Sequence, residues 1–181
     1  MGKISAPSPE FGSNALSVKR YSSLTVVGIG NDLRSDDAVG LMVLRELKHL
    51  LPPEVKAAEL TDDQLGLIDL MQPDQIIIII DAVRSSSPVG TIFRLNAASE
   101  PIPKNFFSFS THSIDTVQAI EMARAMGRLP ECVIVYGIAG RDFSFSSQQS
   151  PEVIDAAEVV RSRILEDIRL ISAECRSESG I

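Results

Sequence analysis

Hydrophobic and polar positions along the chain alternate between short β-branched runs and longer stretches with helical spacing. The clearest run is residues 76–80, five consecutive isoleucines followed at once by Asp81. Both faces of this segment are apolar, so it predicts a central strand, over 75–83, of a parallel sheet that is buried on both sides. Shorter patterns predict further strands at 24–30, 55–60, 91–95 and 132–138.

Apolar residues at helical spacing lie between these strands and after the last one. Helices are predicted at 38–51, 62–71, 113–126 and 151–171. The second has Thr61 or Asp62 as its cap, and the fourth has Ser150 as its N-cap and Pro151 in its first position. The alternation predicts an α/β fold, in which helices cover both faces of a mostly parallel sheet. Ligand-binding residues in such folds gather at the carboxyl ends of the strands.

Length and charge narrow the classes of function. A chain of 181 residues suits one domain, and a formal net charge of −7 disfavours nucleic acid or an anionic membrane as the principal partner. The longest apolar run is far shorter than the roughly 20 residues of a transmembrane helix. Residues 1–15 have the pattern of cloning remnants or a disordered tail, without a secretory signal. We expect a domain over 22–175, a flexible end at 176–181 and a cytoplasmic location.

Polar residues follow the predicted strands at three places. The first strand ends in Gly28-Ile29-Gly30-Asn31 and leads to the acidic pair Asp36 and Asp37, which has an alternative interpretation as a helix N-cap. Asp81 follows the isoleucine run, and His112 lies at the start of the predicted third helix. His49, in a charged helical segment, is interpreted as a surface residue.

Together, Asp37, Asp81 and His112 are candidates for one site with two carboxylates and an imidazole. These donors suit a divalent transition metal, and they equally suit an acid–base pair that activates water without a metal. The sequence contains no HExxH, GxSxG or Walker motif, so it gives no support to a zincin, a serine hydrolase or a P-loop enzyme.

Four blocks of the sequence, in the same order, resemble the hydrogenase maturation endopeptidases, nickel-dependent peptidases that trim the large-subunit precursor of [NiFe] hydrogenases. The resemblance covers nearly the whole chain from residue 24 to the last helix. Its blocks are Gly28-Ile29-Gly30-Asn31 with Leu33-Arg34 and Asp36-Asp37, Ile80-Asp81-Ala82-Val83 with Gly90-Thr91, Ser110 and His112 with Leu129-Pro130-Glu131, and Ser150-Pro151-Glu152-Val153.

This resemblance implies a single α/β peptidase domain with a twisted, five-stranded sheet. It implies that Asp37, where relatives often have Glu, together with Asp81 and His112 binds nickel and carries out catalysis. The substrate is then a precursor that already holds the nickel, so the free enzyme is expected to be metal-free. A monomeric free enzyme is a separate expectation. The metal polarises the scissile carbonyl, or one aspartate acts as general base and the metal serves for recognition.

Two segments depart from the common family pattern, and both are interpreted as determinants of substrate choice. The segment Thr61-Asp62-Asp63-Gln64-Leu65 is similar to the subgroup that serves bidirectional, NAD-linked hydrogenases. The segment 137–143 differs from the Gly-Ile-Gln-Pro-Glu form of many relatives. The residues expected to bind substrate are Asn31, Asp36, Asp62, Asp63 and Gln64.

Two other classes of function stay open at this stage. The glycine turn at Gly28 and Gly30 is compatible with a nucleotide- or cofactor-binding module, although that interpretation gives His112 no role and lacks the acid about 20 residues beyond the turn. A non-catalytic hydrogenase-assembly protein is the other alternative. Phe106, Phe107 and Phe109 are interpreted as core residues, with a wall for the precursor's extension as the alternative.

Overall fold

Five strands form one sheet at the centre of the protein. The computed structural model describes residues 22–61, 64–99, 102, 115–146 and 148–177. The sheet has the order β2-β1-β3-β5-β4, in which only the pair β4 and β5 is antiparallel. The prediction of a mostly parallel, five-stranded sheet is therefore confirmed. The strands are β1 (Ser23–Ile29), β2 (Val55–Leu60), β3 (Gln75–Arg84), β4 (Ile92–Asn96) and β5 (Cys132–Gly140).

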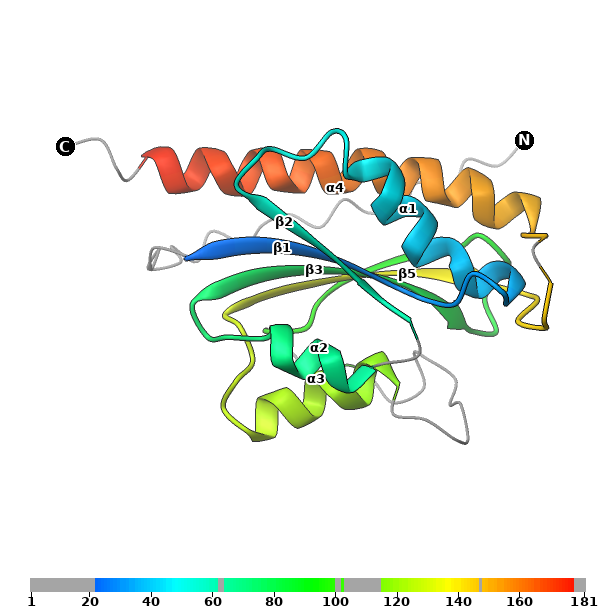
Figure 1. The fold of residues 1–181 in the computed structure, drawn as a ribbon, viewed down its shortest axis with the longest axis horizontal. Helices are drawn as coiled ribbons and strands as arrows, with labels where there is room; N and C mark the ends of the chain where they lie inside the picture. Colours follow the sequence, from blue (N-terminus) through cyan, green and yellow to red (C-terminus); the bar gives the residue numbers. More distant parts are fainter. Residues whose placement is uncertain (1–21, 62–63, 100–101, 103–114, 147, 178–181) are drawn as a thin grey trace.

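Helices cover both faces of the sheet, so the predicted three layers are confirmed. On one face lie α1 (Val39–Leu47), which the short 3-10 helix η1 (Ser35–Ala38) precedes, and the long α4 (Pro151–Ser177) (Figure 1). On the other face lie α2 (Gln64–Leu70) and α3 (Thr116–Ala125) (Figure 1). None of the helices in the described ranges is both long enough and apolar enough to span a membrane.

The isoleucine run forms part of two hydrophobic cores, one on each face of the sheet. All five isoleucines are at most 2% exposed. Ile77 and Ile79 pack with residues of α2 and α3, whereas Ile78 and Ile80 pack with residues of α1 and α4. This alternation follows from the pleat of a strand, which directs successive side chains to opposite faces. It explains why the segment lacks an alternating polar pattern.

Several element boundaries differ from those predicted. The first helical segment divides into η1 and α1 and ends at Leu47, not before Pro52. The third helix begins at Thr116, because Asp115 and Gln118 form a capping box that fixes its start. The central strand ends at Arg84, one residue beyond its predicted end, because 81–84 pair with 137–140 of β5. The last helix extends to Ser177.

Candidate active site

The segment between β1 and α1 lies against the carboxyl ends of β1 and β3. A Cβ atom on Gly40, at the start of α1, would overlap the main-chain oxygens of Ile29 and Ile80. A Cβ on Gly30 would overlap the main-chain oxygen of Asp37, whose carbonyl accepts a hydrogen bond from Asn31 N at 3.3 Å. Because these glycines allow close backbone contact, η1 and its acidic residues are held beside the end of β3.

Asp81 and Asp37 form a pair of interacting carboxylates at this edge. Burial is the largest influence on Asp81 and raises its pKa to about 7, and the charge of Asp37 acts in the same direction. The hydroxyl of Thr116, donating to Asp81 Oδ2 at 2.5 Å, and the backbone N–H of Ala82 oppose this rise in pKa. The structure therefore brings together two of the three residues predicted for the site.

Thr116 was not among the predicted site residues. It is the first residue of α3, is 3% exposed, and links the start of that helix to the end of β3 through its hydrogen bond to Asp81. A threonine four residues after His112 is a weak signal, because Thr is common near helix starts for capping alone. The contact depends on a partner 35 positions away in the sequence.

Asp36 has a different environment from its neighbour Asp37. Its side chain is fully buried, and its two oxygens accept hydrogen bonds from Arg141 N, Asp142 N, Ser150 N and Ser150 Oγ at 2.6–2.9 Å. Burial by itself disfavours the charge, but the N–H donors of Asp142, Ser150 and Arg141 outweigh it and hold the pKa of Asp36 below its ordinary value. Asp36 therefore joins η1 to the segment between β5 and α4.

This environment gives Asp36 a structural role, whereas the sequence predicted it to bind substrate. Its two carboxylate oxygens accept four hydrogen bonds from Arg141, Asp142 and Ser150, and no part of the residue is exposed. The hydroxyl of Ser150, the predicted N-cap of the last helix, donates to Asp36, while its carbonyl accepts from Val153 N and Ile154 N.

The remaining predicted residues are divided between the described and undescribed parts of the chain. Asn31 lies in the turn after β1, where its Oδ1 accepts a hydrogen bond from Leu33 N at 2.9 Å. Gln64 is the first residue of α2, and His49 is exposed just after α1. His112, Asp62 and Asp63 lie outside the described residues, as does the phenylalanine cluster Phe106, Phe107 and Phe109. Their predicted roles stay predictions.

The described residues supply two of the three predicted ligands for a cation. Within the described ranges, no group of three His, Cys, Asp or Glu side chains is arranged to hold a metal. The predicted set includes His112, so the described residues supply two carboxylates. A cation between Asp37 and Asp81 would reduce the repulsion that contributes to the raised pKa of Asp81. Carboxylate oxygens are competent ligands for divalent first-row metals.

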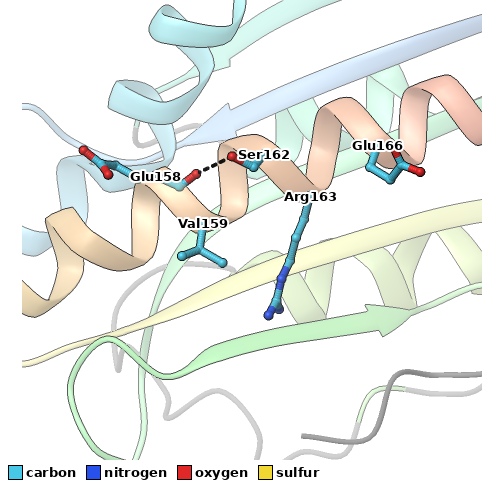
Figure 2. Close-up of a pocket in the computed structure, with 5 residues that line it drawn as sticks. All are labelled: Glu158, Val159, Ser162, Arg163 and Glu166. Carbon is cyan, nitrogen blue, oxygen red and sulfur yellow. Dashed lines mark hydrogen bonds between the residues drawn. The ribbon is translucent and has the colours of Figure 1, made fainter. Parts of the chain in front are cut away.

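A separate open depression lies on the outer surface of α4. It is lined by Glu158, Val159, Ser162, Arg163 and Glu166, all from this one helix (Figure 2). The charged side chains diverge, and the Ser162 hydroxyl donates to the Glu158 carbonyl within the helix at 3.1 Å (Figure 2). A ligand site requires polar groups that converge, so this depression has no feature of a catalytic pocket.

Comparisons with known proteins point in one direction. A family model described as hydrogenase maturation protease matches residues 43–167. The hydrogenase 2 maturation protease of Escherichia coli is 23% identical over 162 residues, which are 87% of this chain and 98% of that protein. A putative hydrogenase maturation protease of Methanocaldococcus jannaschii is 24% identical over 166 residues, or 84% of this chain and 94% of the relative.

Solved structures with the same fold carry similar names. The hydrogenase maturating endopeptidase HybD from E. coli superposes with a TM-score of 0.70 and 23% identity, covering 87% of this chain and 94% of that one. The [NiFe] hydrogenase maturation protease HycI from Thermococcus kodakarensis superposes with a TM-score of 0.62 and 22% identity, covering 81% of this chain and 92% of that one. At these identities, the structural likeness establishes the fold.

Proposed function

The chain belongs to the hydrogenase maturation protease family, and from this premise we propose that it removes the C-terminal extension of a nickel-loaded [NiFe] hydrogenase large-subunit precursor. The observation that carries the proposal is the pair Asp37 and Asp81 at the carboxyl edge of the sheet. Burial, together with the charge of Asp37, raises the pKa of Asp81 to about 7. Two acids with such a relation are a common feature of catalytic and metal-binding sites.

In this proposal, nickel arrives as part of the substrate. Asp37, Asp81 and His112 complete its coordination, so a precursor without nickel lacks the element that the enzyme recognises. The sequence supports a place for His112 in this set, because His112 stands four positions before Thr116, whose hydroxyl donates to Asp81.

In the version of the mechanism in which nickel serves only for recognition and does not bind Asp81, this residue has the protonation behaviour of a general base. With a pKa of about 7, a substantial fraction of its carboxyl groups is ionised at neutral pH. The ionised form accepts a proton from water as the water oxygen attacks the scissile carbonyl carbon. The same proton then passes to the leaving amine as the C–N bond breaks. The alternative is that the metal polarises the carbonyl and the carboxylates only hold it.

The proposal is tested by incubating the protein with large-subunit precursors, with and without nickel, and measuring loss of the C-terminal extension by mass spectrometry. Cleavage of the nickel-loaded form alone is expected. Asp81→Asn is expected to reduce the rate by about 10²–10⁴-fold, the range found when an acid–base group is removed. His49→Ala, an exposed residue away from the acids, is the matched control and is expected to process normally.

Three outcomes would contradict this assignment. Binding of the precursor without any cleavage would favour a non-catalytic assembly protein. Equal cleavage of nickel-free precursor would remove nickel from recognition, and normal processing by Asp81→Asn would remove Asp81 from the site.

We further propose that the enzyme acts as a monomer in the cytoplasm, without a nucleic-acid or membrane partner.

A further inference from the structure

Two arginines lie three residues along the chain from the two acids. Arg34 precedes Asp37 by three positions, and Arg84 follows Asp81 by three positions on β3. In the part of the chain that the structure describes, no carboxylate forms an ion pair with either guanidinium. Each instead lies over an aromatic ring of the segment after β5. Arg34 Cζ is 5.1 Å from the centroid of Phe145, and Arg84 Cζ is 3.9 Å from that of Phe143.

The segment that carries these rings, residues 141–146, is held in place by hydrogen bonds. The backbone N–H groups of Arg141 and Asp142 donate to the buried carboxylate of Asp36. At the other end of the segment, Ser146 N donates to Leu33 O at 3.0 Å, and Ser35 N donates to Ser146 O at 2.5 Å. Phe143 and Phe145 are therefore fixed beside the loop that bears Arg34 and beside the end of β3.

The backbone at Ser35 supports this view of a constrained loop. Its φ of +45° is unusual for a residue other than glycine and persists only when surrounding contacts hold it. Those contacts are the hydrogen bond from Ser35 N and the bond from its hydroxyl to Gln148 O at 2.5 Å. The residue between Arg34 and the buried Asp36 is thus locked, and Arg34 is positioned before any ligand binds.

A guanidinium over an aromatic ring keeps its in-plane N–H groups available. Stacking occupies one face of the planar group, while its edge can still bind a carboxylate through two parallel hydrogen bonds. The surroundings have the composition of a protein-binding surface, because Leu33 is 67% exposed and Phe145 is 77% exposed beside these arginines. Arg141, in contrast, already lies near a carboxylate, 3.9 Å from Glu152.

We propose that Arg34 and Arg84 form a clamp that binds an acidic side chain of the peptide substrate, close to the scissile bond. This inference rests on the proposed endopeptidase function. The protein carries 24 acidic against 17 basic side chains, so most of its surface repels an acidic peptide. Two arginines that have no carboxylate partner among the described residues give such a peptide a specific point of attachment.

Strand geometry places Arg84 about 10 Å from Asp81 along β3 and on the other face of the sheet, because each residue rises about 3.3 Å and successive side chains alternate between faces. Asp81 faces α3, where it contacts Thr116, whereas Arg84 shares the face of Ile78 and Ile80 toward α1 and α4. A substrate held by Arg84 therefore crosses the carboxyl edge of the sheet between the scissile bond and its acidic residue. The departure of segment 137–143 from the common family form, predicted to affect substrate choice, includes the ring of Phe143.

The clamp is tested with Arg34→Gln, Arg84→Gln and the double variant. Each is compared with Arg163→Gln, which removes an exposed arginine of α4 whose guanidinium has no ion-pair partner among the described residues. With nickel-loaded precursor, the double variant is expected to raise KM about 10- to 100-fold while kcat changes less than threefold. The control is expected to match the wild type, and all variants should keep the wild-type Tm.

The substrate provides the complementary arm. A precursor whose acidic residues within four positions of the scissile bond are replaced by amides should show the same increase in KM with the wild-type enzyme. With the double variant, these replacements should raise KM no further, because the two changes remove one interaction. A precursor lengthened at its C-terminus should be cut normally, since the clamp binds a side chain. Strong loss with the lengthened form would assign the arginines to the terminal carboxylate and overturn the proposal.

A direct binding measurement separates this inference from the proposed function. Fluorescence anisotropy with a labelled ten-residue peptide that spans the precursor's cleavage position requires no cleavage. If the wild type cuts no precursor but binds the acidic peptide more tightly than its amide form, and the double variant loses this preference, the clamp holds while the peptidase assignment fails. Equal binding of both peptides, or an unchanged KM in the double variant, would refute the clamp.

Discussion

Asp36 and Asp81 both lie at the carboxyl edge of the sheet, and the protein surrounds their carboxylates in opposite ways. Asp36 accepts four hydrogen bonds, three of them from backbone N–H groups, and its pKa is lowered. Asp81 accepts one hydrogen bond from Thr116 and one from the Ala82 backbone, interacts with the charge of Asp37, and its pKa is raised to about 7.

The difference separates an acid that stabilises the fold from one that is available for chemistry. A buried carboxylate with all its hydrogen bonds satisfied contributes to stability and gains nothing from a ligand. A half-buried carboxylate beside a like charge, such as Asp81, destabilises the native state until a cation or a proton binds. Asp36 thus fixes the loop that presents Asp37 to Asp81, and the strain is confined to the pair that the proposed function uses.

The largest expected effect on stability comes from removing the satisfied acid. Asp36→Ala leaves the N–H groups of Arg141, Asp142 and Ser150 buried without their acceptor, at a cost of about 3–5 kcal/mol in the free energy of unfolding. Urea unfolding at pH 7 measures it. Asp69→Ala, which removes an exposed acid, is the control and should change stability by less than about 0.5 kcal/mol. A loss below 1 kcal/mol for Asp36→Ala would contradict the anchoring role.

Asp81→Asn is expected to change the free energy of unfolding in the opposite direction, by stabilising the protein. A pKa raised from 3.8 to about 7 means that the native state binds more protons than the unfolded state between these values, so stability falls as pH rises through this window. The native-state penalty reaches at most ~4 kcal/mol above pH 7. Asp81→Asn removes it and should stabilise the metal-free protein by about 2–4 kcal/mol at pH 8.

This gain should fall below about 1 kcal/mol toward pH 4, where the native Asp81 is protonated and its unfolded-state carboxyl is about half ionised. Asp36 behaves in the reverse way, because its lowered pKa contributes stability above pH 3.8 that is lost as pH falls below that value. Urea unfolding of wild type and Asp81→Asn at pH 4, 6 and 8, with a chelator present, measures the trend. If Asp81→Asn is less stable than the wild type at pH 8, the ionised Asp81 carboxylate stabilises the native state, and its contrast with Asp36 is wrong.

The sequence predicted the features of the fold that depend on local patterns. The isoleucine run indicated a strand buried on both faces. All five isoleucines are buried, and Ile77 to Ile80 pack in the two cores. Boundaries were less accurate, because they depend on partners elsewhere in the chain. The start of α3 is set by the capping box of Asp115, which the apolar spacing alone does not reveal.

At the site, the sequence indicated which acids gather at the strand ends but not what each of them does. Asp36 and Asp37 are neighbours of the same residue type, so their sequence context is nearly identical. Their difference comes from contacts with residues more than 100 positions away, such as the bond from Ser150 N to Asp36. Thr116 was missed for the same reason, since its role depends on the strand against which α3 begins.

The smallest expected effect tests the link between Thr116 and Asp81. Thr116→Val keeps the shape of the side chain but removes the hydroxyl that donates to Asp81, so the pKa of Asp81 should rise further. The loss of stability should be about 1–2 kcal/mol at pH 8, where the carboxylate is ionised, and smaller at pH 5, where it is protonated. Thr116→Ser, which retains the donor, is the control for packing. If Thr116→Val loses as much stability at pH 5 as at pH 8, Thr116 stabilises only the start of α3. Its hydroxyl then does not lower the pKa of Asp81.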